Sequence, residues 1–180
     1  MSTSPQSLEL YPHGVQHHLA QLNIGIPRGP LDGPVMKDFM DALDSVNAVA
    51  DAAPGFVWRL QTDEGNATAV RAFDDDSLIV NMSVWESLES LRGFVYSSRA
   101  HLDVMRRRRE FFEQMSELFV VLWWVEAEHV PTVPEAEERL TLLRAIGPSP
   151  DAFTFRRHFP PPSTEDAAPV DDDRDLCPAG

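Results

Sequence analysis

The stretch LIVNMSVWESLESLRGFVYSSRAH, residues 78–101, reads as a strand followed directly by a helix. In its first eight residues, apolar side chains alternate with a set that mixes small polar groups and one large aromatic ring. Because successive side chains of a strand point to opposite faces, this pattern predicts one apolar face and one partly polar face. Ser87 is a suitable N-cap, and Leu88, Leu91 and Phe94 recur at helical spacing, so we expect a helix immediately after the strand.

The rest of the chain shows the same two patterns, strands with alternating faces and helices with apolar stripes. The predicted strands are residues 17–24, 56–61, 78–85 and 119–126, with a short closing strand near 153–155, and the predicted helices are residues 34–53, 87–97, about 100–116 and 133–146. Residues 67–73 fit either a further strand or an irregular connection. The order β-α-β-β-α-β, with one helix appended, predicts an α+β fold with a ferredoxin-like antiparallel sheet and helices on one face.

The chain length suits one domain with tails. We expect a flexible N-terminal segment over residues 1–15 and the folded domain over residues 16–158. Residues 159–180 are rich in proline and acidic residues and have almost no large apolar side chains, so we expect a disordered tail whose removal leaves stability nearly unchanged.

Composition narrows the classes of partner and compartment. The formal net charge is −14, from 15 basic and 29 acidic residues, which disfavours binding to nucleic acid or to an anionic membrane surface. Cys177 is the one cysteine, so no intramolecular disulfide can form and a cytoplasmic location is expected. No apolar run approaches the roughly 20 residues of a membrane span, and no secretory signal is visible at the N-terminus.

Seven sequence runs carry a family resemblance. They are HLAQLNIG (18–25), DSVNAVAD (44–51), PGFVWRLQ (54–61), GNATAVRAFDD (65–75), LIVNMSVWESLESLRGFVY (78–96), RRRREFFE (106–113) and LWWV (122–125). These runs resemble a bacterial family of uncharacterised domains, DUF3291, over nearly the whole domain. The family in turn resembles the dimeric α/β-barrel superfamily of antibiotic-biosynthesis monooxygenases and haem-degrading oxygenases, which implies a dimeric α/β barrel.

The predicted architecture itself favours a homodimer. A sheet with helices on one face leaves its second face uncovered, and large aromatic side chains there would form an exposed apolar patch. Pairing two such faces across a two-fold axis would bury them and enclose a cavity. We expect the partly polar faces of the strands to line that cavity.

The candidate ligand-binding residues come from these strand faces and from the aromatic side chains nearby. An amide or hydroxyl left unsatisfied in an apolar setting costs about 1–3 kcal/mol, so polar groups on a strand face indicate a wet or ligand-holding pocket. The alternative is that these groups hydrogen-bond one another inside a dimer core. Trp85 is interpreted as cavity wall. The candidate substrate-binding residues are Gln21, Asn23, Trp58, Asn81, Ser83, Trp85, Tyr96 and Trp124.

The candidate catalytic residues are His101 and Arg59, which could handle protons or an oxyanion. Imidazole suits a general base or a haem ligand at neutral pH, although a histidine near a helix start is often a surface or capping residue. In the haem-degrading relatives an Asn, a Trp and a His act together. Asn23 and His101 could take the outer places, but the middle place falls near Phe94 or Tyr96, so the motif is not matched as a unit.

The four consecutive arginines at residues 106–109 suggest an anion-binding site, but their spacing on a helix argues against one. Successive helical residues differ by about 100°, so four consecutive side chains cannot converge on one ligand. A solvated face, with one or two arginines paired to nearby carboxylates, is the expectation.

The sequence therefore predicts a small-molecule enzyme of monooxygenase or isomerase/cyclase type that acts on an apolar aromatic or polyketide-like compound. No redox-cofactor motif is visible, so cofactor-independent chemistry is expected. The alternatives are a homodimer that binds a small ligand or is structural without catalysis, and a haem-binding protein.

Overall fold

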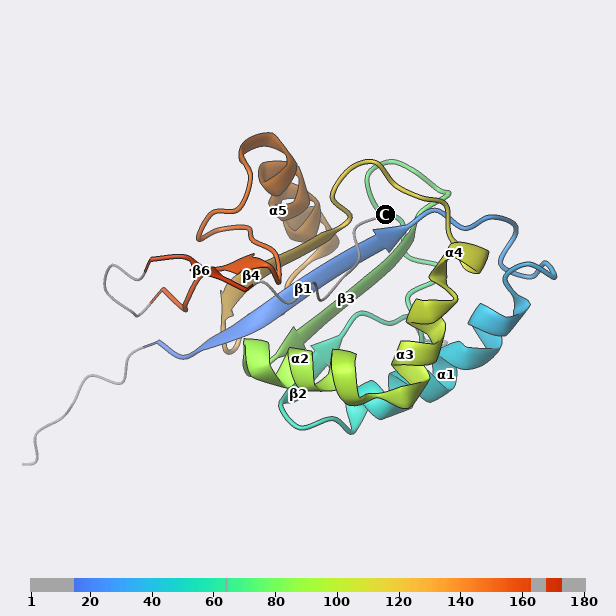
Figure 1. Cartoon of the computed structure of the whole chain (residues 1–180), viewed down its shortest axis with the longest axis horizontal. Coiled ribbons are helices and arrows are strands. Elements are labelled where there is room, and N and C mark those ends of the chain that lie inside the picture. The colour runs from blue at the N-terminus through green and yellow to red at the C-terminus, as the bar shows by residue number, and fades with distance from the viewer. Residues whose placement is uncertain (1–14, 64, 163–167, 173–180) are drawn as a thin grey trace, which may run out of the picture.

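The computed structural model describes residues 15–63, 65–162 and 168–172 and has a four-stranded antiparallel sheet at its centre (Figure 1). The sheet order is β2-β3-β1-β4, which is the ferredoxin-like order expected from the sequence. The elements are β1 (His17–Gly25), α1 (Lys37–Asp51), β2 (Phe56–Arg59), β3 (Ile79–Trp85), α2 (Leu88–Ser97), α3 (Arg99–Arg106), α4 (Arg108–Phe111), β4 (Val120–Glu126), α5 (Val133–Ile146), β5 (Arg157–His158) and β6 (Val170–Asp171). Residues 67–73 form an irregular connection.

The two central strands, β1 and β3, give the sheet two chemically different faces. Their antiparallel register pairs Gln21 with Ser83 and Asn23 with Asn81, so these four polar side chains share one face. We call this the cavity face. The opposite face, which we call the α5 face, is formed by Ala20, Leu22, Ile24, Val80, Met82, Val84, Val121, Trp123 and Val125.

Helices α1, α2 and α3 cover the cavity face, as Figure 1 shows. Ser87 caps α2 by accepting a hydrogen bond of 3.1 Å from the Ser90 amide, as the sequence predicts, and Ser98 caps α3 through the His101 amide. The helix expected over residues 100–116 is shorter than predicted. Its continuation is lost because the backbone at residues 112–113 pairs instead with residues 26–27.

The α5 face is already covered within one chain, so the expectation of an uncovered second face is wrong. The side chains of α5 that pack on it are Ala136, Leu140 and Leu143. The connection between β2 and β3 also packs on the α5 face, through Ala72 and Leu78. Trp123 on this face is fully buried. A homodimer formed by pairing this face would first have to move α5, so the sheet-face argument for a dimer no longer holds.

Strand β2 contains a bulge that the sequence pattern did not reveal. Phe56 pairs with Trp85 and Trp58 pairs with Val84, so the register shifts by one residue between them. A bulge adds one residue to a strand and changes the face on which the following side chains lie. Phe56 and Arg59 therefore lie on the cavity face, whereas Trp58 packs into the core of the α5 face.

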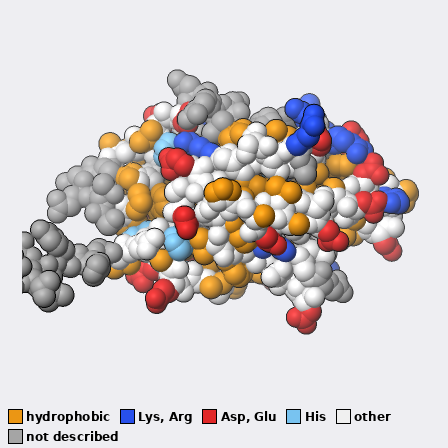
Figure 2. Space-filling view, turned by 90° about the horizontal axis from the view of Figure 1, so that it is seen from below, with side chains coloured by type: hydrophobic (Ala, Val, Ile, Leu, Met, Phe, Trp, Pro, Cys, Tyr) orange, Lys and Arg blue, Asp and Glu red, His pale blue; other side chains and the backbone are white. Residues whose placement is uncertain are grey.

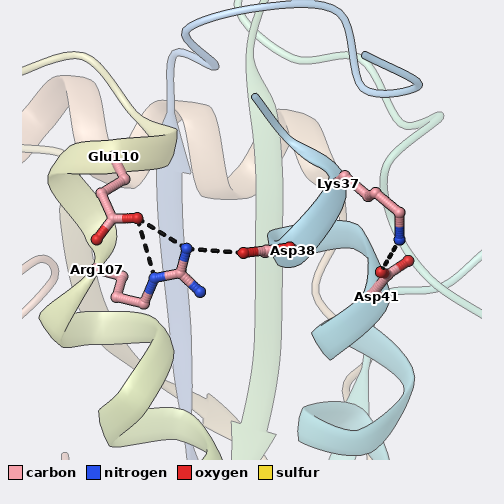
Figure 3. Close-up of polar contacts among 5 residues, drawn as sticks. All are labelled: Lys37, Asp38, Asp41, Arg107 and Glu110. Carbon is pink, nitrogen blue, oxygen red and sulfur yellow. Dashed lines mark hydrogen bonds and ion pairs between the residues drawn. The ribbon is translucent and has the colours of Figure 1, made fainter. Parts of the chain in front are cut away.

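Arg107 connects α1 to α4, two elements beside the cavity face (Figure 3). Its guanidinium donates to Asp38 at 2.8 Å and to Glu110 at 2.8 and 3.0 Å. All three side chains are largely exposed, so each pair contributes at most about 1 kcal/mol. Arg106 pairs with Asp103 instead, which agrees with the expectation that the arginine run does not converge on one anion.

The outer surface carries mixed charge. On the face shown in Figure 2, acidic side chains lie beside the basic ones, and hydrophobic side chains lie across the middle. Within the described ranges, no helix has both the length and the apolar character needed to cross a membrane.

The expectation of a disordered C-terminal tail does not hold for residues 168–172. Val170 and Asp171 form β6, which pairs with β5. Asp172 then reaches Arg92 of α2 at 2.9 Å, and both side chains are only 11–14% exposed. Arg92 also donates to the Phe155 carbonyl, which helps to hold its guanidinium in place. The ion pair between Arg92 and Asp172 then anchors residues 168–172 through a largely buried charge, which composition alone could not indicate. The remaining parts of the predicted tail, 163–167 and 173–180, lie outside the described residues.

We predict that Asp172→Ala lowers the free energy of unfolding by about 1–3 kcal/mol, because it leaves the largely buried Arg92 without its carboxylate partner. Asp171→Ala is the matched control, since Asp171 faces Arg157 at 3.8 Å with both side chains at least half exposed, and it should change stability by less than about 0.5 kcal/mol. Urea unfolding of both variants makes the comparison. Equal stabilities would mean that residues 168–172 do not contribute to the fold.

Candidate functional site

A cavity of about 180 Å³ lies between the cavity face of the sheet and helices α1, α2 and α3. The strands contribute Gln21, Asn23, Asn81 and Ser83 to its lining, while α1 contributes apolar side chains such as Leu43 and Val46. One chain therefore lines this cavity, whereas the sequence predicted a cavity enclosed between two paired sheets.

Three side chains at the floor of the cavity form a hydrogen-bond chain. The Trp85 indole N–H donates to the Ser83 hydroxyl at 2.9 Å, and that hydroxyl donates to Oε1 of Gln21 at 3.1 Å. Gln21 and Ser83 are 8% exposed and Trp85 is 1% exposed. Trp85 is further fixed by Phe94, which stacks on it at 5.2 Å between ring centroids, and by Phe56 at 5.3 Å, edge to face. The Ser83 hydroxyl thus uses its proton and one of its two lone pairs within the protein.

Asn23 and Asn81 lie directly opposite each other on β1 and β3, yet neither side chain has a hydrogen-bond partner among the described residues. Asn81 is exposed and Asn23 is partly buried. Because an amide in a dry core would cost about 1–3 kcal/mol if left unpaired, these two groups indicate that this end of the cavity is open to water. The alternative that the two amides bond each other in a dry core does not fit these contacts.

His101 lines the cavity from the first turn of α3. Its Nδ1 lies 3.2 Å from the Val95 carbonyl, and its ring packs on Phe94 at 5.0 Å between centroids. A carbonyl oxygen can only accept, so Nδ1 carries the proton and Nε2 keeps its lone pair. Burial lowers the pKa of His101 below its ordinary value, against the opposing effect of the Val95 carbonyl. His101 is therefore neutral at pH 7, with a proton-accepting nitrogen available at the cavity.

Arg59 also lines the cavity, but most of its donors are already used. Nε and Nη2 donate to both carboxylate oxygens of Asp51 at 2.7 and 3.2 Å, and Nη1 donates to the Gly65 carbonyl at 2.7 Å. These bonds tie β2 to the end of α1 and to the following loop. Arg59 can present positive charge to a ligand, but guanidinium does not release a proton and so cannot serve as a general base.

The structure brings most of the sequence-predicted site residues together and excludes three. The residues that line the cavity are Gln21, Asn23, Arg59, Asn81, Ser83, Trp85 and His101. Trp58 directly precedes Arg59 in β2, so it lies on the opposite face and packs into the core of the α5 face. Tyr96 is 37% exposed and does not line the cavity. Trp124 shares the cavity face but packs against Phe153 and donates its indole N–H to the Phe159 carbonyl.

Sequence reasoning missed Asn47 and Arg108, which both line the cavity. Asn47 comes four residues after Leu43, within the apolar stripe of α1, and a polar residue in such a stripe is the signal that could have found it. Arg108 lies over the Phe119 ring at 4.1 Å. Its role as a cation over an aromatic face could not be read from a run of four arginines.

Within the part of the chain that the structure describes, no cluster of three or more His, Cys, Asp and Glu side chains could hold a metal ion.

Comparison with known proteins identifies the family. The model of the family "Domain of unknown function (DUF3291)" matches residues 18–169. The chain belongs to the DUF3291 family. This confirms the resemblance of the sequence runs and assigns no activity. Curated proteins give no match.

Solved structures with similar chain traces are distant from this DUF3291 member. SnoaB, a cofactor-independent oxygenase from Streptomyces nogalater, is 17% identical with a TM-score of 0.41, covering 63% of this chain and 95% of SnoaB. A protein of unknown function from Nitrosomonas europaea is 12% identical with a TM-score of 0.40, covering 66% and 97%. A provisionally assigned antibiotic biosynthesis monooxygenase from Chloroflexus aurantiacus J-10-fl is 14% identical with a TM-score of 0.39, covering 64% and 98%. At these TM-scores and identities the similarities do not indicate a shared activity.

We predict that Asn23→Leu and Asn81→Leu each change the free energy of unfolding by less than about 1 kcal/mol, because neither amide loses a protein partner. In the double variant, the two changes in the free energy of unfolding should add within about 0.5 kcal/mol.

Ser83→Ala is the contrasting variant. It should cost about 1–3 kcal/mol, because the Trp85 N–H and the Gln21 carbonyl both lose their partner. Thermal melts decide, and a double variant more stable than either single variant would argue for a dry asparagine pair.

We also predict that His101 makes the fold less stable as the pH falls. In the unfolded chain His101 binds a proton near its ordinary pKa of 6.5, whereas burial lowers the pKa in the folded chain. The stabilisation is complete above pH 6.5 and is lost as the pH falls through the folded-state pKa. Urea unfolding at pH 7.5 and 5.5 should therefore show a smaller loss for His101→Gln than for the wild type. The pKa of His158 is also lowered, mainly by burial and then by Arg92, so part of the loss should persist. An unchanged loss in the variant would contradict the assignment.

Proposed function

We propose that this chain is a small-molecule enzyme of monooxygenase or isomerase/cyclase type, acting on an apolar aromatic compound held in the cavity. The supporting observation is the fixed tautomer of His101, whose Nδ1 donates to Val95 and whose Nε2 is left as a base at the cavity wall. His101 is itself one of the residues that line this cavity. The same cavity offers amides that can orient the polar groups of a ligand.

The two reaction types share a first step that His101 can perform. A neutral imidazole removes a proton from an acidic O–H group, or from a carbon next to a carbonyl, and a positioned base of this kind contributes about 10²–10⁴-fold to the rate. The negative charge then develops on the substrate oxygen. Arg59 and Arg108 supply positive charge at the lining of the cavity, and the amides supply hydrogen-bond donors. In a monooxygenase the deprotonated ring would next meet dioxygen as co-substrate, whereas in an isomerase or cyclase the proton would return elsewhere.

The volume of the cavity favours a small substrate. An engineered cavity of about 150 Å³ holds benzene, so about 180 Å³ suits one substituted aromatic ring. A multi-ring polyketide-like compound would have to extend through the water-exposed end near Asn81. We therefore favour the aromatic over the polyketide-like alternative.

Cofactor-independent catalysis is part of the proposal. A haem group is the alternative cofactor, and His101 has the right donor chemistry for it, with Nε2 free of protein hydrogen bonds. The cavity volume is too small for a porphyrin, which is several times the size of the single ring that such a volume accommodates. Haem does not fit, and we derive no step through it.

Two further features remain proposals. The family resemblance supports a homodimer, although α5 blocks pairing through the sheet face that it covers, and the single cysteine supports a cytoplasmic location. A non-enzymatic homodimer that binds a small ligand or is structural is the second candidate function. The water-exposed amides of Asn23 and Asn81 suit a ligand-binding role equally well.

The experiment that tests catalysis measures proton abstraction directly. A panel of one-ring phenols and aryl ketones is incubated in D₂O, and exchange next to the carbonyl is followed by NMR, alongside oxygen uptake. We expect exchange or uptake with at least one compound, and a loss of about 10²-fold or more in His101→Gln. His129→Gln is the matched control, because His129 bonds Glu135 on the surface, outside the cavity.

Ligands that bind without exchange or uptake would favour the binding module over the enzyme. Equal rates in the wild type and His101→Gln would remove His101 as the base.

A further inference from the structure

The direction of the Gln21 amide is set by its neighbours, and this restricts the ligand. The starting point is Trp85, whose indole N–H can only donate. Its hydrogen bond of 2.9 Å to Ser83 makes the hydroxyl oxygen an acceptor at that position. The hydroxyl then has one proton to place, and Oε1 of Gln21 at 3.1 Å is its acceptor.

The reverse orientation of Gln21 is disfavoured by burial. If the amide were flipped, its NH₂ group would face Ser83 and the hydroxyl proton would lose its acceptor. Ser83 is buried, so a hydroxyl proton left without its protein acceptor would carry the free-energy penalty of an unsatisfied buried donor. The chain Trp85 to Ser83 to Gln21 therefore holds the carbonyl oxygen of Gln21 toward β3 and turns its NH₂ group away from it.

The NH₂ group of Gln21 has no acceptor among the described residues. Among the described residues, the bond from Ser83 is the one hydrogen bond of this side chain, and Gln21 belongs to the lining of the cavity. The Nε2 atom is not fully buried, and it belongs to a residue that lines the cavity, so a ligand there could accept its hydrogen bond. A donor of fixed direction thus lies at the floor of a mostly apolar space, on the same strand face as Asn23 and Asn81.

We propose that Gln21 is the specificity-determining residue of this cavity, and that it selects ligands in which an apolar ring carries an acceptor oxygen, such as an aryl ketone or a quinone. Trp85 and Ser83 act as positioning residues that hold the amide in its donating orientation. This inference rests on the proposed small-molecule function and adds the chemical class of the ligand. It concerns recognition, so it holds for an enzyme and for a binding module alike.

The test compares two probes of nearly equal shape, acetophenone and ethylbenzene, by isothermal titration calorimetry. A neutral hydrogen bond that survives competition with water is expected to make acetophenone bind about three- to tenfold more tightly to the wild-type protein. Gln21→Met keeps the side-chain length but removes the donor, and the two probes should then bind equally. Gln114→Met, on an exposed loop outside the cavity, is the matched control and should keep the preference.

The positioning role of Ser83 needs its own variants. Ser83→Ala frees the Gln21 amide to rotate, so the preference for acetophenone should shrink while ethylbenzene affinity stays the same. Ser83→Thr retains the hydroxyl and should restore the preference. If Gln21→Met does not fold, the wild-type protein still provides a readout, because acetophenone should shift the Gln21 side-chain NH₂ resonance in NMR and ethylbenzene should not.

The outcomes separate this inference from the proposed function. Equal binding of both probes to the wild type, or an unchanged preference in Gln21→Met, overturns the role of Gln21 and leaves the cavity as an aromatic site. If neither probe binds, both the ligand class and the small-molecule function fall. A preference that disappears in Gln21→Met and Ser83→Ala and returns in Ser83→Thr supports the inference.

Discussion

Antiparallel pairing of β1 with β3 places Gln21 opposite Ser83 and Asn23 opposite Asn81 in the middle of the sheet. Each amide carries donors and acceptors that must be satisfied by protein, water or ligand. The Ser83 hydroxyl donates to the Gln21 carbonyl and accepts from Trp85, whereas the two asparagine side chains have no hydrogen-bond partner among the described residues. The helices that cover this face therefore cannot close on it as tightly as α5 closes on the opposite, wholly apolar face. The cavity is the structural result of that difference.

The walls of the cavity are held by contacts that lie outside it. Ser87 and Ser98 cap α2 and α3, which fixes where each helix starts, and Arg107 links α1 to α4. Arg59 joins β2 to the end of α1 through Asp51. Individually these polar contacts are weak where they are exposed. Together they keep three separate helices at a set distance from the sheet, which an apolar contact alone would not do because it would favour closer packing.

The alternation of β1 and β3 was readable from sequence because each strand is regular and has faces of different polarity. That alternation, with the helix periodicity, was enough to predict the sheet order and to place Gln21, Asn23, Asn81, Ser83 and Trp85 on one face. The position of Phe56 was not predictable, because the bulge after it puts Phe56 on the same face as Arg59 without leaving a mark in the apolar pattern. Trp58 lies on the other face because it directly precedes Arg59 in the strand.

The C-terminal segment shows a different limit. Residues 168–172 have the composition of an unstructured tail, yet they pair with β5 and meet Arg92. The partner that orders them is about eighty residues away, so local composition carries no information about it. The same holds for the covering of the α5 face, since the helix that covers it was recognised from its sequence but its docking site was not.

Enclosure of the cavity by a single chain has a consequence for binding stoichiometry. The lining that the structure describes comes from the strands and helices of one chain, so each chain carries its own cavity. An assembly of any number of chains would take up one ligand per chain, and the sites would fill independently unless assembly also displaced α1, α2 or α3. Cooperativity in a binding isotherm would then report motion of those helices relative to the sheet.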